Sequence, residues 1–130
     1  MTLVLDASAA VELVLALERG ARVATALVGE NLVAPELLDV EVLSAVHRLR
    51  RTKQITGSQA DRGIDRFARL PARRVSHVLL RERAWLLRDA VRIGDASYLA
   101  CAAAVGAPLL TCDRRLAGAA APGVNLLLVR

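Results

Sequence analysis

The first eight residues constrain the fold more than any other stretch of the chain. Thr2–Leu5 is a short apolar run, typical of a strand that is buried on both faces in a parallel sheet. The run ends at Asp6, and from Ala7 onward the composition becomes helical. In open α/β sheets, ligands bind beyond the carboxyl ends of the strands. We therefore expect Asp6 at such an edge, and other acidic residues must join it there to make a site.

Helical and strand-like stretches alternate along the rest of the chain. Helices are predicted at 7–17, 21–28, 36–51, 58–70, 78–91, 95–105 and 113–118, and strands at 31–34, 73–75, 109–111 and 124–129. Pro35 is predicted at the first position of a helix, Ser58 as an N-cap, and Trp85 on an apolar helix face. This alternation predicts a parallel sheet with helices on both faces. The sequence shows no repeat or linker, which predicts one domain over residues 1–130.

Composition narrows the classes of function. Of the 130 residues, 55% are hydrophobic and 2% aromatic, which disfavours a single-strand-binding module that stacks bases on aromatic rings. The net charge is +5, and Lys53 is the only lysine. This balance suits an anionic partner such as nucleic acid, but a solvated arginine surface explains it equally well.

Cysteine content and hydropathy bear on location. Cys101 and Cys112 form neither a CxxC motif nor a metal cluster, so no disulfide framework is expected. No basic and apolar leader precedes Thr2, and Gly106 and Pro108 interrupt the longest uncharged segment. A cytoplasmic protein without a membrane partner is expected.

Four acidic residues stand where such a fold brings side chains together. Asp6 and Asp113 each follow a predicted strand, and Asp95 lies at the start of a helix. Glu41 lies about one turn into the longest helix, at the edge of its core-facing stripe, with Arg48 on the same side. That stripe consists of Leu38, Val42, Ala45, Val46 and Leu49.

Each acid alone also has an ordinary structural explanation. Asp6, Asp95 and Asp113 could cap helices or turns, and Glu41 could reach solvent or pair with Arg48. For single residues, both interpretations stay open. The four together favour a common site, because three of them lie where strand ends deliver side chains to one edge of the sheet.

A cluster of four carboxylates would need a cation. Two carboxylates about 5 Å apart repel by roughly 3 kcal/mol at an effective dielectric constant near 20. Oxygen ligands with no cysteine or histidine at ligand spacing favour Mg²⁺ or Mn²⁺ over zinc. His47 and His77 are expected in surface or core positions.

Four motifs in a fixed order carry a family resemblance. They are LVLDAS at Leu3, APELLDVEV at Ala34, GDASYLA at Gly94 and PLLTCDRRL at Pro108. The ordered set resembles the PIN-domain ribonucleases, specifically the VapC-type toxins of VapBC toxin–antitoxin modules, over essentially the whole chain. The resemblance implies a single-domain three-layer α/β/α PIN fold with a central parallel sheet.

The resemblance also implies a site and a reaction. The implied metal site consists of Asp6, Glu41, Asp95 and Asp113, with Ser8 and Thr111 as the hydroxyl residues that orient it. The implied reaction is hydrolysis of RNA phosphodiester bonds with Mg²⁺, or Mn²⁺, as cofactor. We expect Asp6 and Asp113 to bind metal directly and Asp95 to bind directly or through water. Glu41 is expected to bind through water or to accept a proton.

The same resemblance assigns roles to the arginines and to the excess of apolar residues. Arg48, Arg114 and Arg115 are candidates for contacts with RNA phosphates, although a cation also suits a helix carboxyl terminus such as that near Arg48. Where some relatives have further acids, this chain has arginines after Asp113, which leaves the number of metal ions open. Val40, Leu43 and His47 lie away from the core stripe and are predicted to bind an antitoxin, with simple burial as the alternative. A homodimer is also implied.

Three other classes compete with the nuclease interpretation. A signalling receiver domain would have a second acid beside Asp6 and a later lysine, and an aspartate-nucleophile phosphatase would have an aspartate where Ser8 stands. A catalytically silent PIN-fold binding module remains the main alternative, and the presence of all four acids disfavours it.

Overall fold

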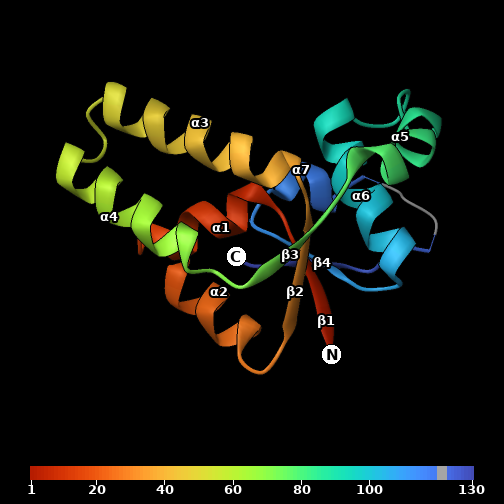
Figure 1. The fold of residues 1–130 in the computed structure, drawn as a ribbon, viewed down its shortest axis with the longest axis horizontal. Helices are drawn as coiled ribbons and strands as arrows, with labels where there is room; N and C mark the ends of the chain where they lie inside the picture. Colours follow the sequence, from red (N-terminus) through yellow and green to blue (C-terminus); the bar gives the residue numbers. More distant parts are fainter. Residues whose placement is uncertain (120–122) are drawn as a thin grey trace.

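The structure is a computed structural model that describes residues 1–119 and 123–130 (Figure 1). In chain order its elements are β1 (Thr2–Leu5), α1 (Ala7–Val14), α2 (Gly20–Leu27), β2 (Asn31–Pro35), α3 (Leu37–Arg51), α4 (Gly57–Ala68), β3 (Ala72–Val75), α5 (His77–Leu86), α6 (Ile93–Val105), β4 (Leu109–Thr111), α7 (Arg114–Ala117) and β5 (Leu126–Leu128). The strands form one parallel sheet in the order β3-β2-β1-β4-β5. The predicted parallel sheet is therefore confirmed, with residues 73–75 in an edge strand as expected.

The central position of β1 carries Asp6 to the edge of the sheet. Val4 pairs with Val33 of β2 on one side and with Leu109 of β4 on the other. Leu5 pairs with Leu110, so the chain leaves β1 and β4 at the same level. Because both strands run in the same direction, the residues that follow them meet beyond their carboxyl ends.

Two groups of helices cover the sheet. On one side α1 packs against α2, α3 and α4, and on the other α6 packs against α5, β1 and β2. Figure 1 shows these two groups on opposite sides of the strands. The three-layer α/β/α architecture is confirmed.

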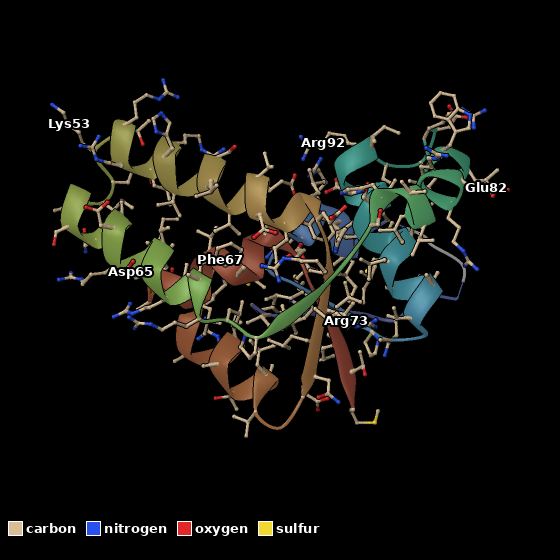
Figure 2. The ribbon with its side chains drawn as sticks, viewed as in Figure 1. Lys53, Asp65, Phe67, Arg73, Glu82 and Arg92 are labelled. Carbon is tan, nitrogen blue, oxygen red and sulfur yellow. The ribbon has the colours of Figure 1, made fainter. Side chains whose placement is uncertain are left out.

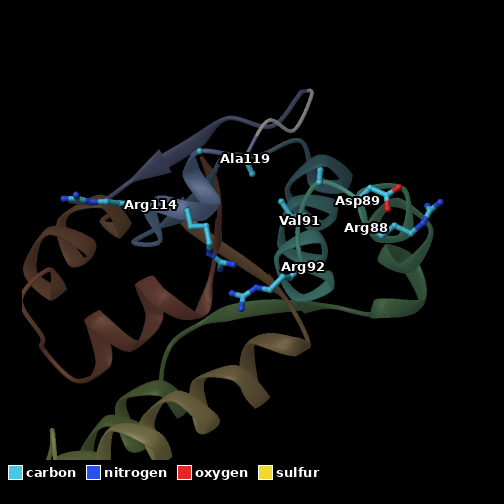
Figure 3. A pocket seen from close by; sticks show the side chains of 9 residues that line it. Arg88, Asp89, Val91, Arg92, Arg114 and Ala119 are labelled. Atoms are coloured by element: carbon cyan, nitrogen blue, oxygen red, sulfur yellow. The ribbon is translucent and has the colours of Figure 1, made fainter.

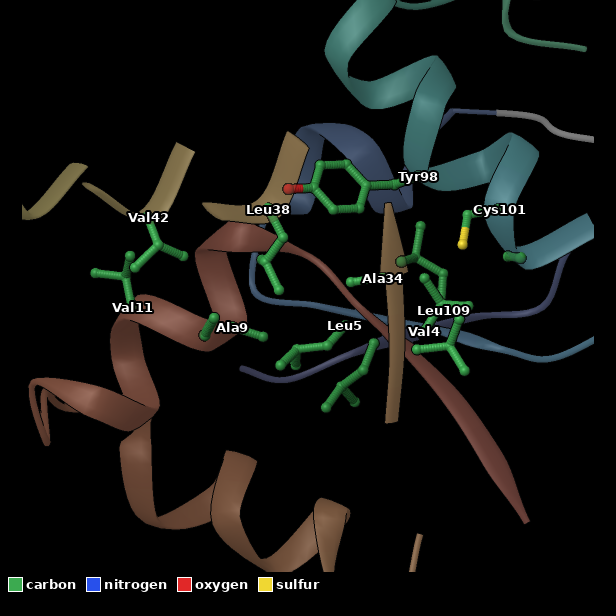
Figure 4. Packing of buried hydrophobic residues seen from close by; sticks show 14 of the residues in the cluster. Val4, Leu5, Ala9, Val11, Ala34, Leu38, Val42, Tyr98, Cys101 and Leu109 are labelled. Atoms are coloured by element: carbon green, nitrogen blue, oxygen red, sulfur yellow. The ribbon is translucent and has the colours of Figure 1, made fainter. Parts of the chain in front are cut away.

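The core is built almost entirely of aliphatic side chains. Leu5 and Leu38 are fully buried, and in Figure 4 Val11 of α1 points toward Val42 of α3. Burying such a side chain contributes about 1.5–3 kcal/mol to folding. Tight packing of aliphatic side chains therefore holds α1, α3 and the sheet together beneath the edge that carries Asp6.

Two predictions about helix starts were wrong for local reasons. Helix α4 begins at Gly57, and its N-cap is Thr56, two residues before the predicted cap Ser58. The Thr56 side chain accepts from the N–H of Gln59, whose side chain accepts from the N–H of Thr56. This reciprocal capping box leaves Ser58 inside the helix. Pro35 is the last residue of β2, and the first N–H of α3, that of Leu37, donates to Nε2 of His77 at 2.9 Å.

The predicted helix 78–91 is also shorter in the structure. Helix α5 ends at Leu86. Trp85 lies among apolar side chains of this helix as predicted, but together with Val78, Leu79 and Leu86 it is exposed, at 61%. Its ring stacks against the guanidinium of Arg88, which lies 4.7 Å from the ring centroid. None of the helices in the described ranges has the length and apolar composition needed to cross a bilayer.

Candidate active site

Asp6 is a buried carboxylate held by several donors. It is 4% exposed, and its Oδ1 accepts from the N–H of Ala9 at 3.0 Å and from Ser8 Oγ at 2.7 Å. Its Oδ2 accepts from Thr111 Oγ1. Burial raises the pKa of Asp6 from 3.8 to about 6, against the lowering effect of these hydrogen bonds. Asp6 is therefore fixed in orientation and lacks the solvation that its charge requires.

The loop after β4 is tied to Asp6 through two hydroxyl groups. Ser8 Oγ accepts from the N–H of Cys112 at 2.9 Å, and Thr111 Oγ1 accepts from the N–H of Asp113 at the same distance. Asp113 is the N-cap of α7, and its Oδ1 accepts from the backbone N–H of Arg115. Ser8 and Thr111 thus connect the two strand ends that carry Asp6 and Asp113.

The guanidinium of Arg115 bridges two of the acids. Its NH2 group lies 3.0 Å from Asp113 Oδ2 and 3.2 Å from Asp95 Oδ2. Burial alone would raise the pKa of Asp113, but hydrogen bonds from Arg115 and the backbone outweigh it and lower that pKa. Asp95 lies in the first turn of α6, whose N-cap is Arg92, so the N-cap explanation for Asp95 was wrong.

Glu41 reaches the site from α3 and is held by Tyr98. The Tyr98 hydroxyl donates to Glu41 Oε1 at 2.6 Å, and burial raises the pKa of Tyr98, so the hydroxyl stays a donor. A Cβ on Gly94 would lie 3.3 Å from Glu41 Oε2, a contact tighter than side chains usually make. Gly94 therefore leaves room for Glu41 beside the start of α6.

All four predicted acids line one cavity of about 600 Å³. Its wall also includes Ser8, Glu12, Arg19, Arg48, Arg92 and Tyr98. Carboxylate and hydroxyl oxygens are donors that suit Mg²⁺ or Mn²⁺. The structure therefore brings the four acids around one space, and their role as metal ligands stays a prediction.

The side chains as placed do not yet form a closed metal cage. Within residues 1–119 and 123–130, no three acidic, histidine or cysteine side chains are grouped so that they could hold an ion. Arg115 accounts for part of this, because it occupies the space between Asp95 and Asp113 with its own positive charge. The oxygen donors around the cavity are nevertheless of the type that suits a divalent cation, and such an ion would compete with Arg115 for Asp95 and Asp113.

The predicted arginines lie in different places. Arg48 lines the acidic cavity, and Arg115 contacts two of its acids. Arg114 is exposed and lines a neighbouring cavity. Contact with RNA stays a prediction for all three.

Glu12 and Arg19 were missed at the level of sequence. Glu12 is 8% exposed, and its Oε1 accepts from Arg19 Nε at 3.0 Å and from Arg19 NH2 at 2.8 Å. Arg19 NH1 also donates to the carbonyl oxygen of Cys112 at 2.8 Å. The Glu12–Arg19 ion pair therefore connects α1 to Cys112, the residue that precedes Asp113. A single acid inside the apolar run Val11–Val14 was the available signal, and its partner arginine follows seven residues later.

Comparison with known proteins shows which family this chain resembles in sequence and in fold. The chain matches the PIN domain family over residues 3–122. Ribonuclease VapC12 of Mycobacterium tuberculosis (strain CDC 1551 / Oshkosh) is 42% identical over 115 residues, which cover 88% of this chain and 89% of that protein. Ribonuclease VapC1 of the same strain is 40% identical over 131 residues, covering 98% and 97%. A crystal structure of VapBC2 from Rickettsia felis bound to a DNA fragment from their promoter aligns with a TM-score of 0.68 at 14% identity, covering 100% of both chains.

The fold and the cavity together define a parallel α/β domain with carboxylates at the carboxyl edge of its sheet. With the match over most of its length, the chain belongs to the PIN domain family. Its relatives at 40–42% identity are VapC ribonucleases.

Proposed function

We propose that this protein is a VapC-type toxin, a metal-dependent endoribonuclease that hydrolyses RNA phosphodiester bonds and is neutralised by a cognate antitoxin. The observation that carries the proposal is the Asp6 carboxylate, buried, held by Ser8 and Thr111, and facing a cavity with three further acids. The names of the relatives, ribonuclease VapC12 and VapC1, support the same activity.

The residues of the site divide the work of the reaction. Asp6 and Asp113 would hold Mg²⁺ or Mn²⁺ directly, and Asp95 would hold it directly or through water. When bound, the cation supplies a water of lowered pKa and offsets charge on the phosphate. Ser8 and Thr111 keep Asp6 in one orientation, so its geometry is set before substrate arrives.

Glu41 is placed to move a proton. Tyr98 binds Oε1, and we assign Oε2 as the oxygen that accepts the proton of the attacking water. Arg48 lines the same cavity and would attract an RNA phosphate to a pocket that is otherwise repulsive to it. One or two ions fit this division of roles.

The proposal is tested by incubating the purified protein with RNA and Mg²⁺ or Mn²⁺. Cleavage should require the metal, stop with a chelator and fall at least about a hundredfold in Asp6→Asn, the scale of a lost transition-state interaction. Asp65→Asn, a change of one exposed acid on α4, is the matched control and should cleave normally (Figure 2). Cleavage that survives Asp6→Asn would contradict the site.

The second candidate function is a catalytically silent binding module. The contact of Arg115 with Asp95 and Asp113 favours it, because a permanent internal cation would exclude the metal. Absence of cleavage with many RNAs and both metals, together with absence of Mn²⁺ binding, would select this alternative.

The antitoxin is proposed to bind the outer side of α3. Val40 and Leu43 are 61% and 51% exposed, and His47 is exposed beside them, so simple burial does not explain them. An amphipathic helix of the antitoxin would cover this side. Leu43→Asp should abolish co-purification with a co-expressed antitoxin, while Val28→Asp on the exposed end of α2 should not. A homodimer and a cytoplasmic location complete the proposal.

A further inference from the structure

A second cavity, of about 610 Å³, lies beside the acidic one (Figure 3). It lies between the segment that precedes α6 and helix α7, and its charged lining consists of Arg88, Asp89, Arg92, Arg114 and Arg115. Four arginines against one aspartate give this wall a net positive charge. The wall of the acidic cavity carries more acids than arginines. The two spaces therefore attract ligands of opposite charge.

The two cavities are joined through Arg92 and Arg115. Arg92 lines both of them, and in Figure 3 its side chain extends from the start of α6 toward α7. Arg115 lines the basic cavity while its NH2 group contacts Asp95 and Asp113 of the acidic one. A ligand that spans this boundary would meet carboxylates on one side and guanidinium groups on the other.

Arg92 is accessible for a new partner. Its side chain is 73% exposed, and its Nε lies 3.7 Å from Asp95 Oδ2, beyond hydrogen-bonding distance. Arg88, by contrast, donates from NH1 to the carbonyl oxygen of Trp85 at 2.8 Å and stacks on its ring. Guanidinium groups carry a permanent charge and a planar set of donors that matches the oxygens of a phosphate.

We propose that this basic cavity binds a backbone phosphate of the RNA strand next to the phosphodiester that is cleaved, with Arg92 as its main donor. The proposal rests on the proposed function, because the acidic cavity must hold the scissile bond for the strand to enter the basic one. A phosphate held by Arg92 fixes how far the strand can slide, so the basic cavity sets the register of the RNA across the four acids.

Binding can be tested without cleavage in the Asp6→Asn background. Affinity for a fluorescein-labelled single-stranded RNA is measured over a series of salt concentrations. Adding Arg92→Ala should weaken binding about tenfold, the equivalent of one charge-assisted hydrogen bond, and lower the salt slope by about 1. Arg73→Ala is the matched control: it removes an exposed arginine from β3, far from Arg92 in Figure 2, and should change neither quantity. Equal effects of the two variants would overturn the proposal.

A phosphate scan assigns the contact to one position of the strand. RNAs in which single phosphates are replaced by neutral methylphosphonates are compared in Asp6→Asn and in Asp6→Asn with Arg92→Ala. One replacement should weaken binding to the first protein about tenfold and add nothing in the second. Additive losses at every position would overturn the proposal.

A conservative variant tests the proposal even if Arg92→Ala unfolds. Arg92→Lys keeps the positive charge but loses the planar donors, so its RNA binding should keep the salt slope, with an affinity between those of Asp6→Asn alone and of Asp6→Asn with Arg92→Ala. Failure of the wild-type protein to cleave RNA would remove the proposed function. The phosphate scan uses binding alone, so it decides the place of Arg92 whatever the cleavage result.

Discussion

At the scale of single residues, Asp6 serves the fold and the proposed chemistry with the same two oxygens. Oδ1 caps α1 through the N–H of Ala9, while Ser8 and Thr111 fix the carboxylate in place. Burial nevertheless removes water from the Asp6 carboxylate and disfavours its charged form, which raises its pKa to about 6. The metal-free protein therefore carries an unfavourable charge at the centre of its site.

This cost predicts a pH-dependent stability difference between wild type and Asp6→Asn. Asp6 titrates near 3.8 when unfolded and at about 6 when folded, so between these values the folded state binds more protons. The free energy of unfolding of the wild type should therefore fall as pH rises through this window, by about 3 kcal/mol in total. Asp6→Asn keeps a good N-cap and should lack this loss.

Urea unfolding of both proteins with a chelator, at several pH values across the window, measures the difference. Asp65→Asn, which changes an exposed acid on α4, serves as the control for the substitution itself. A pH-independent difference for Asp6→Asn would contradict the prediction.

Arg115 gives the second prediction at this scale. Because its guanidinium contacts both Asp95 and Asp113, it competes with any cation at these acids. Arg115→Ala should therefore bind Mn²⁺ severalfold more tightly, measured by electron paramagnetic resonance titration. The control is Arg114→Ala, which removes the neighbouring exposed arginine and should leave Mn²⁺ affinity unchanged.

The positions of the acids could be predicted from the sequence, but the side-chain contacts that they make could not. Strand ends suffice to bring Asp6 and Asp113 to one edge, whereas Asp95 reaches it from the first turn of α6. The bond from Tyr98 to Glu41 joins residues 57 apart, and the contact between Arg115 and Asp95 joins residues 20 apart. Such contacts depend on side-chain rotamers and on the packing of α3, α6 and α7, which periodicity does not encode.

At the scale of elements, local chemistry explains which boundaries were predictable. Gly106 ends α6 in a left-handed conformation, with φ of 65°, so this boundary follows from the residue type alone. The start of α4 was misplaced because both Thr56 and Ser58 are good caps. The reciprocal bond with Gln59 decides between them. The end of α5 was misplaced because Trp85 continues an apolar pattern that no neighbouring element covers.

The corrected cap is open to a direct test. Thr56→Ala should lower the free energy of unfolding by about 1 kcal/mol, because it removes the acceptor for the N–H of Gln59. Ser58→Ala, inside the first turn, should change it by less than about 0.5 kcal/mol. Chemical denaturation of the two variants measures this, and a larger loss for Ser58→Ala would restore Ser58 as the cap.

At the scale of the whole molecule, apolar residues are left uncovered on α5. Leu79 and Leu86 are 72% and 74% exposed, and Val78 and Trp85 are exposed on the same helix. Large exposed apolar side chains that cluster on one element mark a contact surface for another chain. These side chains stay exposed although α5 packs against α6, so the location of the surface emerges only from the structure.

The proposed homodimer should therefore depend on α5. Leu79→Asp should convert a dimer to a monomer in light scattering after gel filtration, with little loss of stability, because the residue is already exposed in the single chain. Val28→Asp places an aspartate at another exposed apolar site, the C-cap of α2, and should remain dimeric. A monomeric wild-type protein at micromolar concentration would contradict the homodimer.

The N-cap roles of Asp6 and Asp113 have a consequence for how such a protein would lose its activity during descent. A gene copy released from selection for cleavage still needs residues that start α1 and α7. Asparagine and serine meet that need almost as well as aspartate, whereas alanine does not. We therefore expect inactive descendants to drift first to these residues at positions 6 and 113, keeping a stable fold and nearly the same sequence. The loss of cleavage would then change only a few side-chain atoms of the protein.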